Sequence, residues 1–155
     1  NGVRGCDDDV RKVIALAVDV DVLGTAHKEQ NLPPTKQDAI DTLNELPIPP
    51  SVIVDSGYGI YGYYLLEGPI NTTDAETRKH VSAIYKGFGK SVTKAFAEKG
   101  WKIDQVFNLS HCFRVPGSLN HKLNSGKPEC RVIADNGIFY TLEDIPLLDC
   151  KCFLH

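Results

Sequence analysis

The sequence predicts a single α+β domain, because strand-like and helix-like segments interleave without the strict rhythm of a parallel α/β sheet. The stretch 13–22, VIALAVDVDV, is nearly continuously apolar and β-branched, as is typical of a buried central strand. The stretch 73–99 has apolar residues at helical spacing and lysines off that face, which predicts a long helix. The chain has 155 residues, enough for one domain with a substantial core. We expect this domain to span residues 1–149, with a tail at 150–155.

Between the first strand and the long helix, the sequence predicts a short helix and a hairpin. Thr35 is a good N-cap for a helix over 35–46, and a proline-rich segment ends that helix. Residues 51–54 and 59–66 are expected to form two strands, joined as a hairpin around the DSGYG segment.

The elements after this hairpin are less regular. Gly87 and Gly89 interrupt the long helix and mark a close packing contact. Beyond that helix we expect a strand or turn at 111–115, a loop at 116–128, strands at 130–134 and 138–140, and a short helical turn at 141–145.

The overall composition is that of a globular protein, with 42 % hydrophobic and 24 % charged residues. The chain contains neither a signal-peptide pattern nor an apolar run of the roughly 18 residues that suggest a membrane helix, so we expect no membrane association. Because it begins at Asn1 and contains no Met, we expect a fragment of a longer protein. Five cysteines, an odd number without a paired framework, favour a reducing, cytoplasmic compartment.

The tail groups three residues that bind zinc in other proteins, namely Cys150, Cys152 and His155. Most structural zinc sites have four ligands, and this segment supplies three. The alternative is that these are ordinary thiols near a chain end.

Charge is distributed unevenly along the chain. Residues 1–77 contain 5 Lys and Arg against 13 Asp and Glu, whereas residues 78–131 contain 11 against 3. This pattern fits either a folded dipole or a cleft in which carboxylates hold a metal and basic residues meet phosphates.

Asp19 and Asp21 form the first candidate site. Two residues at i and i+2 on a strand point to the same face, so their carboxylates can share one or two divalent cations. The surrounding valines favour this interpretation, because burying an uncompensated charge there is unfavourable. The alternative is a solvated strand end.

A second candidate is the turn DSGYG, which contains Ser56, Gly57 and Gly59. A serine hydroxyl and the backbone amides of such a turn can hold a phosphate. An ordinary hairpin turn is the alternative.

The third candidate is the basic Pro-Gly loop FRVPGSLNHK at 113–122. Arg114 and Lys122 are its cations, and Asn120 and His121 are hydrogen-bonding groups. Alone it is an ordinary loop, but with the acidic pair and the glycine turn it is typical of the third side of a nucleotide site.

Together, these stretches resemble the catalytic core of the archaeo-eukaryotic primase superfamily, in its primase-polymerase branch from phages, plasmids and other mobile elements. The likeness covers most of the chain, and the segments that carry it are LAVDVDV, HKEQNLPPT, LPIPPSVIVDSGYGIYGYYLL, WKIDQVFNLSHCFRVPGSLNHK and CRVIADNGIFYTLEDI. It implies a mostly antiparallel central sheet with an RRM-like unit flanked by helices. It also implies a DNA primase and polymerase activity in DNA replication that uses nucleoside triphosphates, a single-stranded DNA template and Mg²⁺ or Mn²⁺, with a fused or associated helicase.

The resemblance also assigns roles to residues. It implies that Asp19 and Asp21 are catalytic metal ligands. It implies that the turn faces the triphosphate and that the basic loop contacts nucleotide or nucleic acid, through Ser56, Gly57, Gly59, Arg114, Asn120 and Lys122.

The chain departs from the family pattern at three positions. Tyr61 stands where the family has a histidine, Asn108 where it has a third metal-binding Asp, and His111 where it usually has an Arg. Asp104 is the nearest remaining carboxylate and matches a separate acidic position of the family. Loss of a negative charge from a metal cluster is worth several kcal/mol. We therefore expect weaker metal binding and slow or absent synthesis, with nucleotide or nucleic-acid binding retained.

Two alternative functions fit parts of the pattern. A catalytically degenerate primase fold would serve as a nucleic-acid- or protein-binding module. A metal-dependent nuclease would use Asp19 and Asp21 but would leave the segment RVPGSLNHK without a role.

Overall fold

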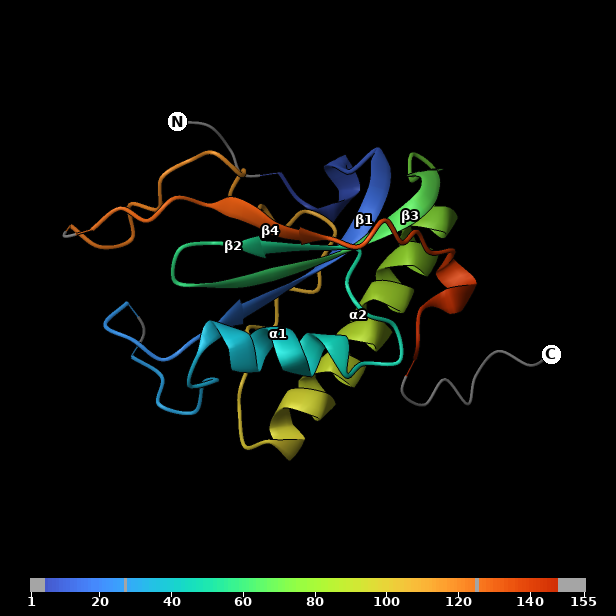
Figure 1. The fold of residues 1–155 in the computed structure, drawn as a ribbon. Coiled ribbons are helices and arrows are strands. Elements are labelled where there is room, and N and C mark those ends of the chain that lie inside the picture. Colours follow the sequence, from blue (N-terminus) through green and yellow to red (C-terminus); the bar gives the residue numbers. More distant parts are fainter. Residues whose placement is uncertain (1–4, 27, 125, 148–155) are drawn as a thin grey trace.

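A computed structural model describes residues 5–26, 28–124 and 126–147, which form a four-stranded antiparallel sheet with two helices packed on one face (Figure 1). The predicted α+β class is confirmed. The elements are, in chain order, a 3₁₀ turn at Asp7–Asp9, β1 at Lys12–Asp21, α1 at Lys36–Asn44, β2 at Val52–Asp55, β3 at Gly59–Asn71, α2 at Ala75–Glu98, β4 at Arg131–Asp135 and a 3₁₀ turn at Leu142–Asp144.

The strands lie in the order β1-β3-β2-β4, so β1 and β4 form the edges of the sheet. The stretch 13–22 is therefore a strand, as predicted, but the prediction that it is central is wrong, because β1 pairs only with β3. The element order β-α-β-β-α-β is that of two split βαβ units. β2 and β3 form the predicted hairpin, and β1 and β2 both pair with β3. Asp19 of β1 therefore lies beside Tyr61 of β3, which lies beside Val54 of β2.

Alternation along the strands separates the two faces of the sheet. Leu16, Val18 and Val20 point toward the helices and are fully buried. Asp19 and Asp21 consequently lie on the opposite face. That face carries a smaller apolar cluster in which Val54, Tyr61 and Cys130 are buried and Phe113 is packed against them.

The predicted N-cap of α1 and the predicted apolar face of α2 are both confirmed. The Thr35 hydroxyl accepts a hydrogen bond from the Asp38 N–H at 3.1 Å, and the Asp38 carboxylate accepts one from the Thr35 N–H at 3.0 Å. In α2, the apolar stripe is buried against the sheet, and the Tyr85 hydroxyl donates to the Ala17 carbonyl at 2.6 Å. A Cβ atom at Gly89 would overlap the Phe107 ring, which confirms the predicted close contact at that glycine.

Two predicted strands are absent. Residues 111–115 have no regular structure, because this segment crosses the sheet face and packs Phe113 onto Tyr61 instead of pairing along an edge. At 138–140, only Tyr140 makes an isolated bridge, with Leu66. The Tyr140 N–H donates to the Leu65 carbonyl at 2.8 Å, its carbonyl accepts from the Glu67 N–H at 3.0 Å, and its hydroxyl donates to the Pro49 carbonyl at 2.6 Å. This segment is therefore held to the sheet at one residue rather than along a strand ladder.

Other predictions concern the ends of the chain and membranes. The cysteine and histidine residues of the tail lie outside the described residues, so the structure tests neither zinc binding nor the alternative of ordinary thiols. No helix among the described residues has both the length and the apolarity needed to cross a membrane.

Candidate functional site

A polar hollow of about 200 Å³ lies on the face of the sheet that the helices leave uncovered. It forms where β1, the β2–β3 turn and the segment between α2 and β4 meet. The residues that line it are Asp19, Asp21, Ser56, Tyr58, Tyr61, Asp104, Arg114, Asn120 and Lys122. The structure thus brings most of the sequence-predicted site residues together from three distant parts of the chain.

The two acidic residues of β1 reach this hollow because of strand register. Asp19 is paired with Tyr61, and Asp21 is paired with Gly59 at the start of β3. A Cβ atom on Gly59 would overlap the carbonyl oxygen of Val20, so only glycine lets the two backbones approach this closely. The glycine keeps the turn of the hairpin beside the carboxylates.

The β2–β3 turn is fixed by contacts from its own residues. The Asp55 carboxylate accepts a hydrogen bond from the Gly57 N–H at 2.8 Å and is paired with the Lys36 ammonium at 2.8 Å. Gly57 has a φ of 99°, a left-handed conformation that glycine adopts without strain. Ser56 is buried and lines the hollow, and its N–H donates to the Gly59 carbonyl at 3.0 Å.

The basic loop docks on this turn through Asn120, which is 2 % exposed. The Asn120 side-chain amide donates to the Ser56 carbonyl at 2.7 Å and accepts from the Lys122 N–H at 3.0 Å. Tyr58 adds a hydrogen bond to the Gly126 carbonyl at 3.0 Å. Asn120 therefore positions the turn and Lys122 with both polar atoms of its side chain.

Electrostatics in the hollow are dominated by its carboxylates. Burial raises the pKa of Asp19 to about 7, and the nearby Asp21 and Asp104 carboxylates contribute to the same rise. Lys122 and Arg114 act in the opposite direction. Three negative groups around a half-buried position favour the binding of a proton or a cation, because either would relieve their mutual repulsion.

Tyr61 contributes an aromatic ring and a neutral hydroxyl. Burial raises the pKa of this hydroxyl above its usual value, and the adjacent Asp19 carboxylate raises it further. The ring packs edge-on against Phe113 with centroids 5.1 Å apart. Tyr61 therefore supplies no positive charge near neutral pH.

Asn108 lies apart from the residues that line the hollow. It lines a separate groove, and its side-chain oxygen accepts a hydrogen bond from the Ser110 hydroxyl at 3.4 Å. The third carboxylate of the hollow comes from Asp104 instead. The sequence shows an acidic residue at position 104, in the segment WKIDQ. Because this segment has no regular structure, no strand register or helical period predicts that its side chain reaches the hollow.

The chemistry of these donors fits a hard divalent cation, which prefers carboxylate oxygens. Within the described ranges, however, no three His, Cys, Asp or Glu side chains are gathered closely enough to form a ready metal cluster. Asp19, Asp21 and Asp104 face one hollow as separate groups, and a cation would have to draw them together.

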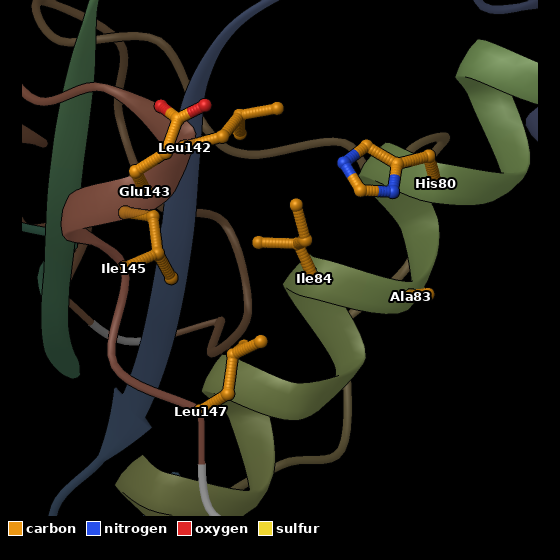
Figure 2. A pocket seen from close by; sticks show the side chains of 7 residues that line it. All are labelled: His80, Ala83, Ile84, Leu142, Glu143, Ile145 and Leu147. Carbon is orange, nitrogen blue, oxygen red and sulfur yellow. The ribbon is translucent and has the colours of Figure 1, made fainter. Parts of the chain in front are cut away.

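A larger hollow of about 390 Å³ lies elsewhere and contains none of the predicted site residues. It separates α2 from the segment that follows Tyr140, with Ile84 and Leu147 among the apolar side chains that line it (Figure 2). His80 and Glu143 lie on opposite sides of it. Its lining is mainly apolar, which does not match the charged chemistry that the sequence predicts.

Comparisons of this chain with protein-family models, with curated proteins and with solved structures found no match. The functional assignment therefore depends on the residues of the hollow.

Proposed function

We propose that this chain is a metal-dependent nucleotidyltransferase domain of the primase-polymerase type, which serves DNA replication in a mobile element. The observation that carries the proposal is the composition of the polar hollow. Three carboxylates, two basic side chains and the Ser56 turn line the same small space. A nucleoside triphosphate with a divalent cation needs this combination of groups.

The acidic residues are assigned to the cation. Asp19, Asp21 and Asp104 offer oxygen ligands, and their mutual repulsion favours a bound positive ion. A cation bound there supplies neutralisation of phosphate charge during nucleotidyl transfer. The raised pKa of Asp19 means that this residue must lose a proton before it can serve as a ligand.

The basic residues and the turn are assigned to the triphosphate. Arg114 and Lys122 line the hollow and lower the pKa of Asp19, so their positive charge acts on the same space. Arg114 can bind phosphate oxygens in a bidentate manner, whereas Lys122 acts as a point charge. The Ser56 hydroxyl lines the hollow and can form a hydrogen bond to the nucleotide, and the Tyr61 hydroxyl, which already has a hydrogen bond to the Arg114 backbone, can donate a second one.

The geometry favours Asp104, rather than Asn108, as the third acidic position. Asp104 acts on the Asp19 carboxylate, whereas Asn108 lines a different groove. If Asp104 occupies the third acidic position, the hollow keeps three carboxylates, and the asparagine at position 108 does not weaken metal binding there. Tyr61 remains as the departure that replaces a chargeable histidine with a neutral group.

A primer-extension assay with Mn²⁺ and a mixture of nucleoside triphosphates tests the proposal. Asp19→Asn and Asp104→Asn should each abolish extension, or reduce it by at least about a hundred-fold, because each removes a charge from the cation site. Asn108→Asp should not raise the rate, because the added carboxylate would lie outside the hollow. Asp41→Asn, on an exposed residue of α1, is the matched control for a lost surface carboxylate.

Calorimetric titration of the chain with Mn²⁺ and a nucleoside triphosphate distinguishes an active enzyme from a domain that only binds these ligands. Wild-type binding that depends on Asp19 but comes without extension would favour the catalytically degenerate alternative, for which the neutral Tyr61 is the supporting observation. Tyr61→His should then restore extension. If Asp19→Asn and Asp41→Asn bind Mn²⁺ and nucleotide equally well, the proposed site is wrong.

A further inference from the structure

A second groove, of about 300 Å³, runs along β1 at the edge of the sheet and is also lined by Tyr85 of α2. One side is formed by β1 and the other by the segment around Asn108 and Phe113, with Tyr63 of β3 between them. Its volume matches the lower end of small-ligand sites. Nothing in the assignment of the polar hollow uses this groove.

Aromatic rings form much of its lining. Phe113 packs against Tyr63 with ring centroids 5.7 Å apart, and His111 packs against Phe113 at 4.8 Å. All three rings are only partly buried, so they retain surface that a ligand can contact. Phe113 also contacts Tyr61, which lines the polar hollow, so the two sites share one aromatic wall.

The polar residues of the groove are basic or uncharged. Lys12 lies on the β1 side and Asn108 on the other, and no Asp or Glu is among the described residues that line it. Close by, the Ser110 N–H and hydroxyl donate to the Asp7 carboxylate at 3.0 and 2.8 Å. Asp7 in turn borders a hollow of mixed charge that also contains Asp8, Lys79 and Lys86.

We propose that this groove holds an unstacked base of a single-stranded nucleic acid. Aromatic faces stack on bases of any sequence, and the Lys12 ammonium at the groove attracts a phosphate of the backbone. The Asn108 side-chain amide can both donate and accept hydrogen bonds, as base edges require. The inference rests on the proposed function in one respect, because the bound nucleic acid would then be the template that lies beside the nucleotide in the polar hollow.

Fluorescence anisotropy of a short fluorescein-labelled oligothymidine, titrated with the full chain in EDTA at low salt, tests the inference. Tyr63→Leu and Phe113→Leu should each weaken binding roughly five- to a hundred-fold, because base–aromatic stacking is lost while apolar volume is kept. Tyr63→Phe should bind like the wild type, since the ring is retained. Phe139→Leu, at a ring that is 56 % exposed and does not line the groove, is the control and should also bind normally.

Thermal unfolding of each variant shows whether it is folded, so that weaker binding reports on the groove. The inference is overturned if the wild-type chain does not bind the oligonucleotide, or if Tyr63→Leu and Phe113→Leu both bind as tightly as Phe139→Leu. It is also overturned if free thymidine monophosphate displaces the oligonucleotide at equal concentration, because the groove would then hold a mononucleotide.

These measurements are independent of the nucleotidyltransferase assignment. EDTA removes divalent cations, and Asp19→Asn should bind the oligonucleotide like the wild type. Loss of Mn²⁺ and nucleotide binding with intact oligonucleotide binding would reject only the proposed function. The reverse result would reject only the aromatic groove.

Discussion

Asp19 is the residue whose environment departs furthest from that of an ordinary surface carboxylate. Its pKa is raised from 3.8 to about 7 by burial and by Asp21 and Asp104. The folded chain therefore holds this proton more tightly than the unfolded chain does. The contribution of this proton to the free energy of unfolding is fully present below about pH 4 and is lost as the pH rises through about 7.

We predict that Asp19→Asn stabilises the chain at pH 8 in the absence of divalent cations. Each unit of pKa shift is worth about 1.4 kcal/mol, and asparagine removes the charge while it stays polar, so a gain of about 1 to 3 kcal/mol is expected. Urea unfolding at pH 8 and at pH 4 measures it, and the gain should shrink toward pH 4. An equal gain at both pH values, or a gain in the control Asp41→Asn, would contradict the pKa argument.

Gly59 is the second residue whose identity follows from its surroundings. A Cβ atom there would overlap the Val20 carbonyl oxygen, and neither backbone can move without breaking the β1–β3 ladder. We predict that Gly59→Ala lowers the free energy of unfolding by at least about 2 kcal/mol. Gly68→Ala, with nothing within 4 Å of the added atom, should change it by no more than about 0.5 kcal/mol in the same urea titration. Equal effects would mean that β1 and β3 can separate locally.

Among the elements, the β2–β3 turn and the basic loop behave as one unit because Asn120 joins them. Its amide donates to Ser56 and accepts from Lys122, while Pro128 packs close to Gly57. We predict that Asn120→Ala lowers the free energy of unfolding by about 1 to 3 kcal/mol, because it leaves the buried Ser56 carbonyl without its donor. Nucleotide affinity should fall as well, since both Ser56 and Lys122 lose their positioning.

Thermal unfolding and nucleotide titration measure these two effects. Asn124→Ala, at an exposed asparagine of the same loop, is the control and should show neither. If Asn120→Ala weakens nucleotide binding without any loss of stability, Asn120 acts as a direct ligand rather than as a positioning residue.

The elements also show which parts of the fold the sequence predicts and which it does not. The helix at 73–99 was predicted because burial of one stripe leaves a helical repeat in the sequence, and the strand at 13–22 because it is a nearly continuous β-branched run. That run did not reveal that the strand lies at the edge of the sheet. Residues 111–115 were expected to be a strand or a turn, but they have no regular structure and Phe113 packs against Tyr61 across the sheet. A contact between residues that are far apart in the sequence leaves no repeating pattern, so it cannot be predicted from the local sequence.

On the scale of the whole molecule, the uneven distribution of charge acquires a structural explanation. The acidic first half of the chain contributes Asp19 and Asp21 to the polar hollow, and the basic second half contributes Arg114 and Lys122. They meet because the segment between α2 and β4 crosses the face of the sheet that the helices leave open. A cleft of this kind was one of the two explanations that the charge pattern left open. The sequence did not place Asp104 in it, since irregular segments are placed by tertiary contacts alone.

This convergence predicts how the whole chain responds to a divalent cation. A ligand at a hundred times its Kd adds about 2.7 kcal/mol to the stability of the folded state, roughly 5 to 11 °C in Tm for a chain of this size. Mn²⁺ at pH 8 should therefore raise the Tm of the wild type. Asp21→Asn should reduce this shift strongly, because it removes one of three carboxylates from the hollow.

The acidic turn Asp7–Asp9 provides the control for this experiment, because an exposed cluster of aspartates also attracts cations. Asp8→Asn should leave the Mn²⁺-dependent shift in Tm unchanged, since the Asp8 carboxylate is paired with Arg78 at 3.0 Å and lies outside the hollow. If Asp8→Asn abolishes the shift and Asp21→Asn does not, the cation binds at the surface turn. In that case a proton on Asp19, rather than a bound cation, would relieve the repulsion among the carboxylates of the hollow.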